Sequence, residues 1–243
     1  MVVDACGAQL RELHLTNSMH DSSGLPLLAP ALRRLSGLEA LHLQQNPLGA
    51  AGAEVLAPAL QALSRLTELQ LALCRLGDER AASLAPAIQA LGSLRALGLG
   101  GNQVGEDGMA ALGPALRAAT ALTRLGLQDN PLGSAGATAL ASAILQGPLS
   151  ELKALELPRA ALGPQGAAAL ALTGLTRLIL RRLRDAGPAA LAPCTGKLTA
   201  QQELNLSHNQ LGKWGFYYLA PTVRSFPCLA CLKLKEEGGE DDE

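Results

Sequence analysis

A short leucine pattern that recurs at near-constant intervals constrains this chain more than any other feature. The pattern L-x-x-L-x-L-x-x-N appears as LRELHLTNS from Leu10 and as LEALHLQQN from Leu38. Copies begin at Leu10, Leu38, Leu66, Leu94, Leu122, Leu152, Leu175, Gln201 and Leu229, which gives intervals of 28, 28, 28, 28, 30, 23, 26 and 28 residues. Self-similarity at this period predicts a solenoid, in which one small unit stacks on copies of itself.

Each copy has two halves with different periods. In the second copy, Leu41 and Leu43 alternate with smaller or polar residues, which is the period of a strand. The segment NPLGAAG supplies turn residues, and Leu56, Leu60 and Leu63 then follow at helical spacing. We therefore expect a short strand, a tight turn and a helix in each unit. A single unit cannot bury enough leucine to offset its lost chain entropy, so neighbouring units must pack together.

The composition supports one repeated unit and excludes several classes of protein. The chain contains 53 Leu and 43 Ala among 243 residues, but only five aromatic residues. Its 17% charged and 48% hydrophobic residues argue against disorder as a whole. The net charge of −1 favours neither nucleic acid nor an anionic membrane, and no apolar run approaches the ~20 residues of a membrane span.

These copies resemble the leucine-rich repeat proteins, in particular the ribonuclease-inhibitor-like class with repeats of about 28 residues. The resemblance implies an α/β horseshoe solenoid with a parallel sheet on its concave face and helices on its convex face. We expect eight full copies and a stub over residues 1–234, followed by an acidic disordered tail over 235–243. The recurring asparagines are expected to satisfy backbone groups in the turn after each strand, and the recurring prolines to lie in or near the helices. These asparagines are Asn46, Asn102, Asn130 and Asn209, and the prolines are Pro30, Pro58, Pro86, Pro114, Pro193 and Pro221.

The concave face is the usual binding surface of that family, and its expected residues divide into zones. Copies one to three are mildly polar, whereas copy four offers a nearly bare patch that includes Gly98 and Gly100. Copies five to seven bring several arginines, which suit carboxylate or phosphate groups of an acidic protein partner. The candidate contacts are Arg124, Arg159, Arg177, Arg181 and Arg182. The alternative interpretation is that these arginines only keep the face solvated.

The two ends of the chain carry further hypotheses. All five aromatic residues lie between Trp214 and Phe226, where they either cap the solenoid or form a partner-facing patch that includes Trp214, Tyr217 and Tyr218. The acidic tail is expected to be a solubilising segment, with binding to a basic partner or to the chain's own arginines as alternatives. The first strand is preceded by no polar cap, which suggests either a longer parent protein or a partner that covers this edge.

No motif predicts catalysis, a metal site or a cofactor. His14 and His42 share a column and are expected within about 5 Å of one another, but no third ligand follows at a typical spacing. Cys228 and Cys231 form an isolated C-x-x-C at the start of a strand, not of a helix. The string GLGGNQVG has Gln103 where a dinucleotide-binding loop needs its third glycine. We therefore expect a protein that is not an enzyme and that binds no metal, cofactor or small-molecule ligand.

The sequence thus favours a non-enzymatic recognition or scaffold module within a larger assembly. It would bind a protein partner through its concave face and aromatic C-terminal end. Nucleic acid is not an expected partner, because no aromatic side chain lies among the arginines to stack on bases. The alternative is a regulator of the GTPase-activating type for a small GTPase, and a third possibility is the sensor part of an innate immune receptor. Five scattered cysteines and the lack of a secretory signal favour a reducing intracellular, cytoplasmic location.

Overall fold

The computed structural model describes residues 9–146, 152–160, 162–171, 177–179, 202–207, 209 and 228–234. Its strands are β1 (Glu12–His14), β2 (Ala40–His42), β3 (Glu68–Gln70), β4 (Ala96–Gly98), β5 (Arg124–Gly126), β6 (Ala154–Glu156), β7 (Arg177–Ile179), β8 (Glu203–Asn205) and β9 (Cys231–Lys233). Its helices are the 3-10 turn η1 (Ser22–Gly24), α2 (Leu25–Leu32), α3 (Gly49–Gln61), α4 (Gly77–Ala90), α5 (Glu106–Ala118), α6 (Gly133–Gln146) and α7 (Gly163–Ala171).

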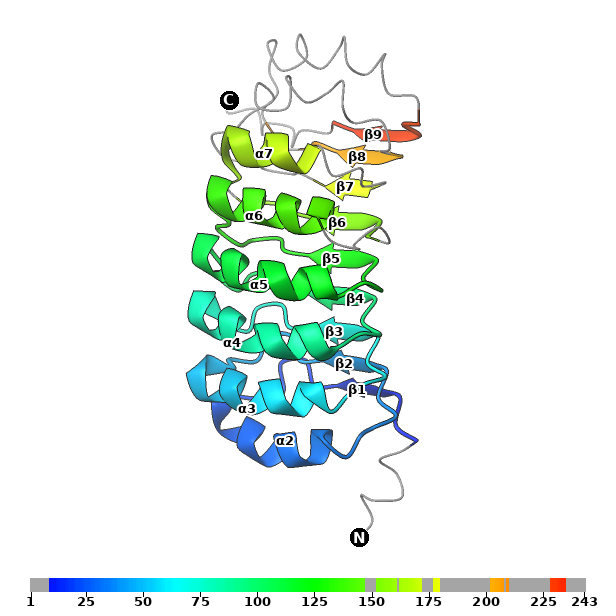
Figure 1. The fold of residues 1–243 in the computed structure, drawn as a ribbon. Helices are drawn as coiled ribbons and strands as arrows, with labels where there is room; N and C mark the ends of the chain where they lie inside the picture. Colours follow the sequence, from blue (N-terminus) through cyan, green and yellow to red (C-terminus); the bar gives the residue numbers. More distant parts are fainter. Residues whose placement is uncertain are drawn as a thin grey trace, which may run out of the picture.

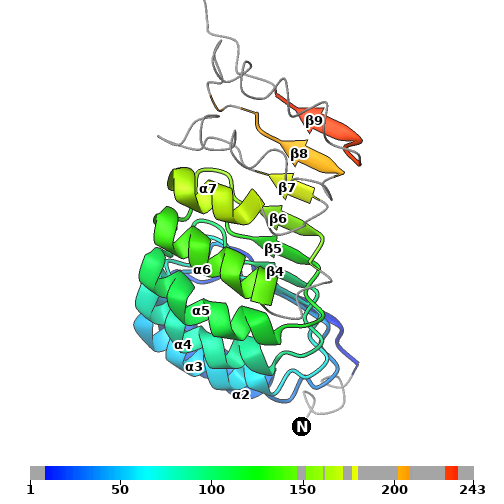
Figure 2. The same cartoon turned by 45° about the horizontal axis from the view of Figure 1, so that its top comes forward.

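The described strands form one parallel sheet whose order in space is their order in the chain, from β1 to β9. The middle leucine of each strand stands opposite the middle leucine of the next, as in Leu41 opposite Leu69 and Leu69 opposite Leu97. Helices α2 to α7 stack in a parallel layer on one side of this sheet, and the other side carries no described helix (Figures 1 and 2). The expected solenoid, with strands on one face and helices on the other, is confirmed.

The hydrophobic core lies between the sheet and the helices. Leu41 and Leu43 of one repeat and Leu56 and Leu60 of its helix are completely buried. Helix α3 ends at Gln61, so Leu63 does not belong to it as its spacing suggested. The Leu63 N–H instead donates to the carbonyl oxygen of Leu60 at 2.9 Å, which tightens the last turn and directs the chain toward the next strand. Leu63 is fully buried all the same.

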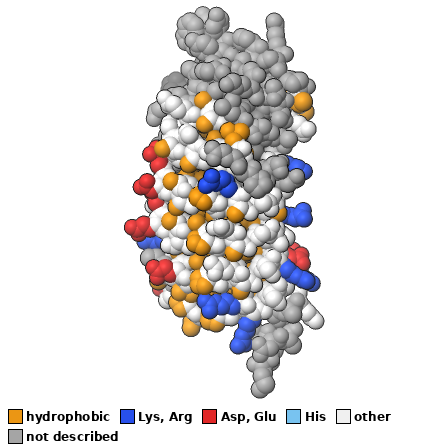
Figure 3. All heavy atoms as spheres, in the orientation of Figure 1, with side chains coloured by type: hydrophobic (Ala, Val, Ile, Leu, Met, Phe, Trp, Pro, Cys, Tyr) orange, Lys and Arg blue, Asp and Glu red, His pale blue; other side chains and the backbone are white. Residues whose placement is uncertain are grey.

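Four of the recurring prolines lie inside helices, as the sequence indicated, and Pro193 and Pro221 lie outside the described residues. Pro30, Pro58, Pro86 and Pro114 are interior residues of α2, α3, α4 and α5. All four are exposed, so water can bond the carbonyl groups that each missing N–H leaves free. The outer surface of the helix layer carries apolar side chains among backbone atoms and polar uncharged side chains, with acidic side chains gathered toward one edge (Figure 3).

The asparagine column ties each repeat to the previous one. Asn102 is fully buried, and its Nδ2 donates to the carbonyl oxygens of Leu71 and Leu99 at 2.7 and 2.9 Å. Its Oδ1 accepts the N–H of Cys74 at 2.8 Å and that of Leu76 at 3.4 Å. The expected role of this column in satisfying the backbone of the turns is therefore confirmed.

Two neighbours in the column make the same set of bonds. The Nδ2 of Asn46 donates to the carbonyl oxygens of Leu15 and Leu43 at 2.7 and 2.8 Å. Asn130 in turn accepts the N–H groups of Asn102 and Val104, both at 3.0 Å. The turns of successive repeats are thus joined by side-chain amides that no solvent reaches.

Candidate functional site

The open face of the sheet presents three residues from each repeat in regular rows. One row precedes the middle leucine of each strand, the second follows it, and the third lies just after the strand. The parallel register places residues of one row about 4.8 Å apart on neighbouring strands. A side chain in one repeat can therefore reach its counterparts about 28 residues earlier and later in the chain.

A row of ionisable side chains begins with the expected histidine pair. The rings of His14 and His42 have their centroids 4.2 Å apart and meet edge to face at 70°, which confirms their predicted proximity. Their Nε2 atoms point to different carboxylates: that of His14 lies 3.3 Å from Glu12, and that of His42 lies 3.4 Å from Glu68. Both carboxylates were expected on the concave face, but their contacts with the histidines were not predicted from the sequence. No set of three or more metal-binding side chains converges among the residues described.

Glu68, in the row that precedes the middle leucines, contacts side chains of three other positions on this face. One of its oxygens accepts the Gln70 Nε2 at 3.1 Å and faces His42, while the other lies 3.6 Å from the Arg124 Nη2. Glu68 thereby links β2 with β5 across the concave face. The carboxylate has three polar neighbours, so it keeps two of them when a binding partner displaces the third.

The predicted arginines that the structure describes are all paired with carboxylates of other repeats. Arg159 makes a two-pronged contact with Asp129, with the Nη2 atom 2.8 Å from Oδ2. The Nε of Arg177 lies 2.9 Å from Glu203 on β8. Arg181, Arg182, Trp214, Tyr217 and Tyr218 lie outside the described residues. The described part of this face is consequently a surface of alternating charge rather than a purely basic one.

Glu203 holds two cations at once. Its second oxygen accepts the Nζ of Lys233 on β9 at 2.8 Å. This hydrogen bond, together with the charges of Arg177 and Lys233, lowers the pKa of Glu203 below its ordinary value. The same contact raises the pKa of Lys233. The side chains of β7, β8 and β9 therefore form one charged group, although their repeats are the least regular in sequence.

Two of the predicted arginines line one hollow of about 400 Å³ at the N-terminal ends of the strands. Arg124 and Arg177 border it from β5 and β7, with Lys153 between them and Glu203 on the far side of Arg177, on β8. Three basic side chains and one acidic side chain therefore line the hollow.

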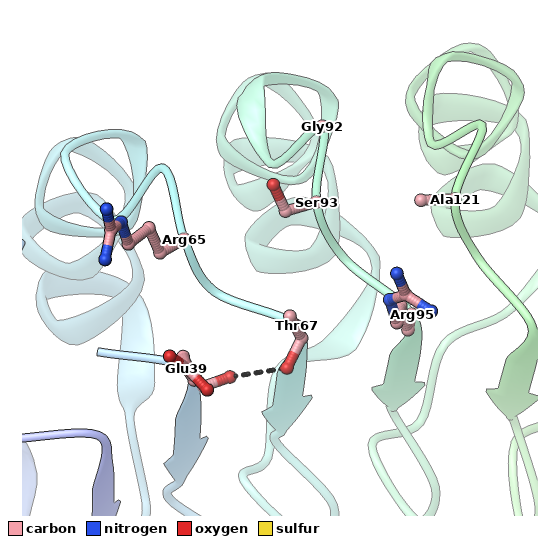
Figure 4. A pocket seen from close by; sticks show the side chains of 7 residues that line it. All are labelled: Glu39, Arg65, Thr67, Gly92, Ser93, Arg95 and Ala121. Carbon is pink, nitrogen blue, oxygen red and sulfur yellow. Dashed lines mark hydrogen bonds between the residues drawn. The ribbon is translucent and has the colours of Figure 1, made fainter. Parts of the chain in front are cut away.

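A larger hollow, of about 510 Å³, lies at the edge of the sheet between the helix-to-strand connections of neighbouring repeats (Figure 4). Arg65 and Arg95 border it on different sides, with Ser93 between them. Within the described part of the chain neither arginine enters an ion pair. The Thr67 hydroxyl is already engaged, because it donates to the carbonyl oxygen of Glu39 at 3.0 Å. The hollow is shallow and lined by exposed side chains, so it lacks the fixed polar groups of a binding site.

A third, smaller hollow of about 130 Å³ lies in the middle of the concave face. Gly98 and Gly126 form its floor, and Gln70, Gln128 and Glu156 stand around it. It coincides with the bare patch that the sequence indicated. Gly98 belongs to β4 as expected, but Gly100 and Gly101 lie in the turn that follows.

The cysteines provide no reactive pair in the described structure. Cys228 is exposed in a turn, and Cys231 begins β9, as the sequence indicated for the C-x-x-C segment. Cys74 is buried in the asparagine column, and burial raises the pKa of its thiol to about 11. A thiol with such a pKa is protonated and unreactive at neutral pH.

The repeat architecture defines a solenoid protein built from strand–turn–helix units, and comparison with known proteins identifies the units. Residues 37–57, 64–85, 93–113 and 119–141 match the family described as Leucine Rich repeat. The matched segments are leucine-rich repeats, and the fold is that of a leucine-rich repeat solenoid. No curated protein matches it significantly. No helix in the described ranges is long and apolar enough to cross a membrane.

Solved structures resemble this chain at low sequence identity. The leucine-rich repeat-containing protein LegL7 from Legionella pneumophila superposes with a TM-score of 0.63 and 21% identity, over 92% of this chain and 72% of that one. An internalin, InlF, from Listeria monocytogenes gives 0.45 and 17%, over 85% of this chain and 64% of that one. The C-terminal domain of tropomodulin from Caenorhabditis elegans gives 0.40 and 14%, over 81% and 89%. The first of these shows the common fold, and the 28-residue period with outer helices is compatible with the ribonuclease-inhibitor-like class.

Proposed function

We propose that this chain is a non-enzymatic recognition module that binds a protein partner on the concave face of its sheet. Leucine-rich repeats generally mediate protein–protein interaction, and solenoids offer extended concave surfaces for it. The observation that carries the proposal is the belt of polar side chains that runs from Glu12 to Lys233, interrupted only by the glycine patch at β4 and β5 among the described strands, and that no described helix covers.

The charge pattern of this belt favours a partner with acidic groups opposite β5 to β7. Arg124 and Arg177 border the same hollow and have side chains about 66% and 46% exposed, so each keeps N–H groups free for a partner. Their existing contacts with Glu68 and Glu203 hold them in place before binding. Such preorganisation lowers the entropy cost of association. Arg181, Arg182 and the aromatic residues Trp214, Tyr217 and Tyr218 are proposed to extend the contact toward the C-terminal end.

The described contacts favour recognition over regulation of a small GTPase. A catalytic arginine supplied to a GTPase must place its guanidinium on a phosphate in the transition state. Arg159 and Arg177 instead make close contacts with carboxylates of the chain itself. No described feature supports the GTPase-activating alternative.

The test is to isolate the tagged full chain from its native cells and to identify its partners by quantitative mass spectrometry. The decisive variant is Arg124→Glu/Arg177→Glu, which reverses two charges at the concave hollow. The matched control is Arg65→Glu/Arg95→Glu, which makes the same charge change at the edge hollow (Figure 4). We expect the first variant to lose partners that the wild type and the control both retain. Retention of every wild-type partner by the first variant would overturn the proposal.

A further inference from the structure

The centre of the concave face has a gap where, in one row, two neighbouring strands have glycine and therefore no side chain. In the row that follows the middle leucine, Gln70 is followed by Gly98, Gly126 and Glu156 on β3, β4, β5 and β6. Because neighbouring strands are about 4.8 Å apart, the Cα atoms of Gln70 and Glu156 stand roughly 14 Å apart. The pocket of about 130 Å³ occupies the space between them.

The walls of this pocket present hydrogen-bond acceptors. The Gln70 Nε2 donates to Glu68 at 3.1 Å, so its Oε1 must face the other way, and it lies directly over Gly98. A Cβ added to Gly126 would lie 3.0 Å from the Gln128 Oε1. That oxygen is buried and accepts no hydrogen bond within the described structure. Leaving such an acceptor unpaired costs about 1–3 kcal/mol, which a donor from a partner would recover.

One acidic and one basic side chain border the pocket, and the basic one is paired elsewhere. Glu156 forms one wall, and its carboxylate enters no ion pair among the residues described. Arg124 also borders the pocket, but its guanidinium is directed to Glu68 at 3.6 Å. A carboxylate entering here would meet Glu156 and two amide oxygens, whereas a cation finds acceptors on three sides.

We propose that the pocket over Gly98 and Gly126 receives a lysine side chain of the protein partner. An ammonium group carries three N–H donors, which match the Gln70 Oε1, the Gln128 Oε1 and the Glu156 carboxylate. Its four methylene groups pack against the floor at Gly126, since the Gln70 amide already lies over Gly98. A volume of about 130 Å³ corresponds to roughly four water molecules of liquid, which suits the five heavy atoms of a lysine side chain. The inference rests on the concave face being the binding surface and adds the chemistry of one contact.

The test uses the full chain and a defined probe. The peptide acetyl-Ala-Lys-Ala-amide is titrated into ¹⁵N-labelled protein at constant ionic strength, to concentrations on the order of tens of millimolar, as suits a single weak contact. The matched control peptide replaces lysine with norleucine, which keeps four side-chain carbons but lacks the ammonium group. We expect saturable shifts of the Gly98 and Gly126 amides and of the Gln128 side-chain amide with the lysine peptide only. Equal shifts with both peptides, or none with either, would overturn the inference.

Two variants make the result specific to this pocket. Gly126→Leu fills it, and its backbone lies outside the left-handed region, so a side chain is tolerated there. Glu156→Gln keeps the shape and removes the charge. We expect Gly126→Leu to abolish the shifts and Glu156→Gln to weaken binding about tenfold. Unchanged binding by both variants contradicts the proposed site. An arginine peptide that binds more tightly than the lysine peptide contradicts the choice of lysine.

The titration is independent of the search for partners. If the pocket binds the lysine peptide but charge reversal on the concave face leaves every native partner bound, the further inference stands and the proposed function is wrong. If native partners depend on the concave face but the pocket does not bind the lysine peptide, only the further inference is wrong.

Discussion

The thiol of Cys74 donates to the backbone carbonyl oxygen of Leu43 at 3.2 Å, across the boundary between two repeats. In the next repeat Asn102 occupies the same column, and its Nδ2 bonds the equivalent oxygen of Leu71 at 2.7 Å. Cysteine thus replaces one amide donor with a weaker S–H donor. The Cys74 sulfur, a weak acceptor, takes the hydrogen bond of the Asn46 N–H. In the equivalent contact further along the column, the Asn130 amide oxygen accepts the N–H of Asn102 at 3.0 Å.

Restoring asparagine at this position is expected to stabilise the solenoid. Cys74→Asn replaces a weak donor and a weak acceptor with amide groups, so the free energy of unfolding should rise by about 1 kcal/mol. The measurement is the midpoint of urea unfolding followed by circular dichroism. The reverse substitution, Asn102→Cys, should lower the midpoint. A Cys74→Asn chain less stable than the wild type would contradict this explanation.

Removing an amide from the column should cost far more than changing an exposed residue. Asn102→Ala leaves the Leu71 carbonyl oxygen and the N–H groups of Cys74 and Leu76 buried without partners, so we expect a loss of about 3 kcal/mol in unfolding free energy. Gln89→Ala, at an exposed position of α4, is the control and should stay within about 0.5 kcal/mol of the wild type. Equal effects of the two substitutions would refute the role given to the column.

The stability of the chain should fall at alkaline pH because of Cys74. Burial raises the pKa of this thiol from an ordinary value of 9.0 to about 11, so the folded state holds a proton that the unfolded state has already lost. The stabilisation linked to the protonated thiol is fully present below pH 9 and is lost as the pH rises to about 11, with an amplitude of up to about 3 kcal/mol. Unfolding curves of the wild type and of Cys74→Asn between these pH values measure the difference. Parallel pH profiles would show that the thiol is not responsible.

The charged group of the last strands predicts a titration in the acidic range. The Lys233 hydrogen bond is the main cause of the lowered pKa of Glu203, and the Arg177 charge contributes less. Lys233→Met should therefore raise the pKa of Glu203 more than Arg177→Met does. The stability linked to this carboxylate is present above its unfolded-state pKa and is lost as the pH falls through the lowered folded-state pKa. Carbon-detected NMR titration of the Glu203 side chain measures both shifts, and the opposite ranking would contradict the assignment.

The fold could be predicted from the sequence because its signal is local and repeated. Leu41 and Leu69 stand opposite one another since each occupies the same place in an identical motif. The His14–His42 contact followed from the same argument, because a parallel register brings equal columns together. The end of α3 was missed by two residues, since Leu63 keeps its burial after the helix has ended and the chain has turned.

The candidate site could be predicted only in outline. Arg124 and Arg177 lie in strands, as the repeat predicts, but the ion pairs that they and Arg159 make with carboxylates were not foreseen. Each partner belongs to another repeat, and it is reached by the direction of a flexible side chain rather than by register. The signal that could have found Asp129 and Glu203 is the presence of acids in the columns next to the arginines.

The sequence by itself determined the repeat, the order of the strands and the rows into which the concave residues fall, because periodic burial of leucine permits a single register. Only the tertiary structure decided that Gln70 turns its oxygen toward the glycine floor and that Arg124 turns away from it. Both orientations depend on Glu68, which lies in the third repeat and bonds residues of its own strand and of the fifth repeat. The motif determines the position of each Cα atom in the sheet, whereas hydrogen bonds among neighbouring side chains determine how the polar end of each side chain is oriented.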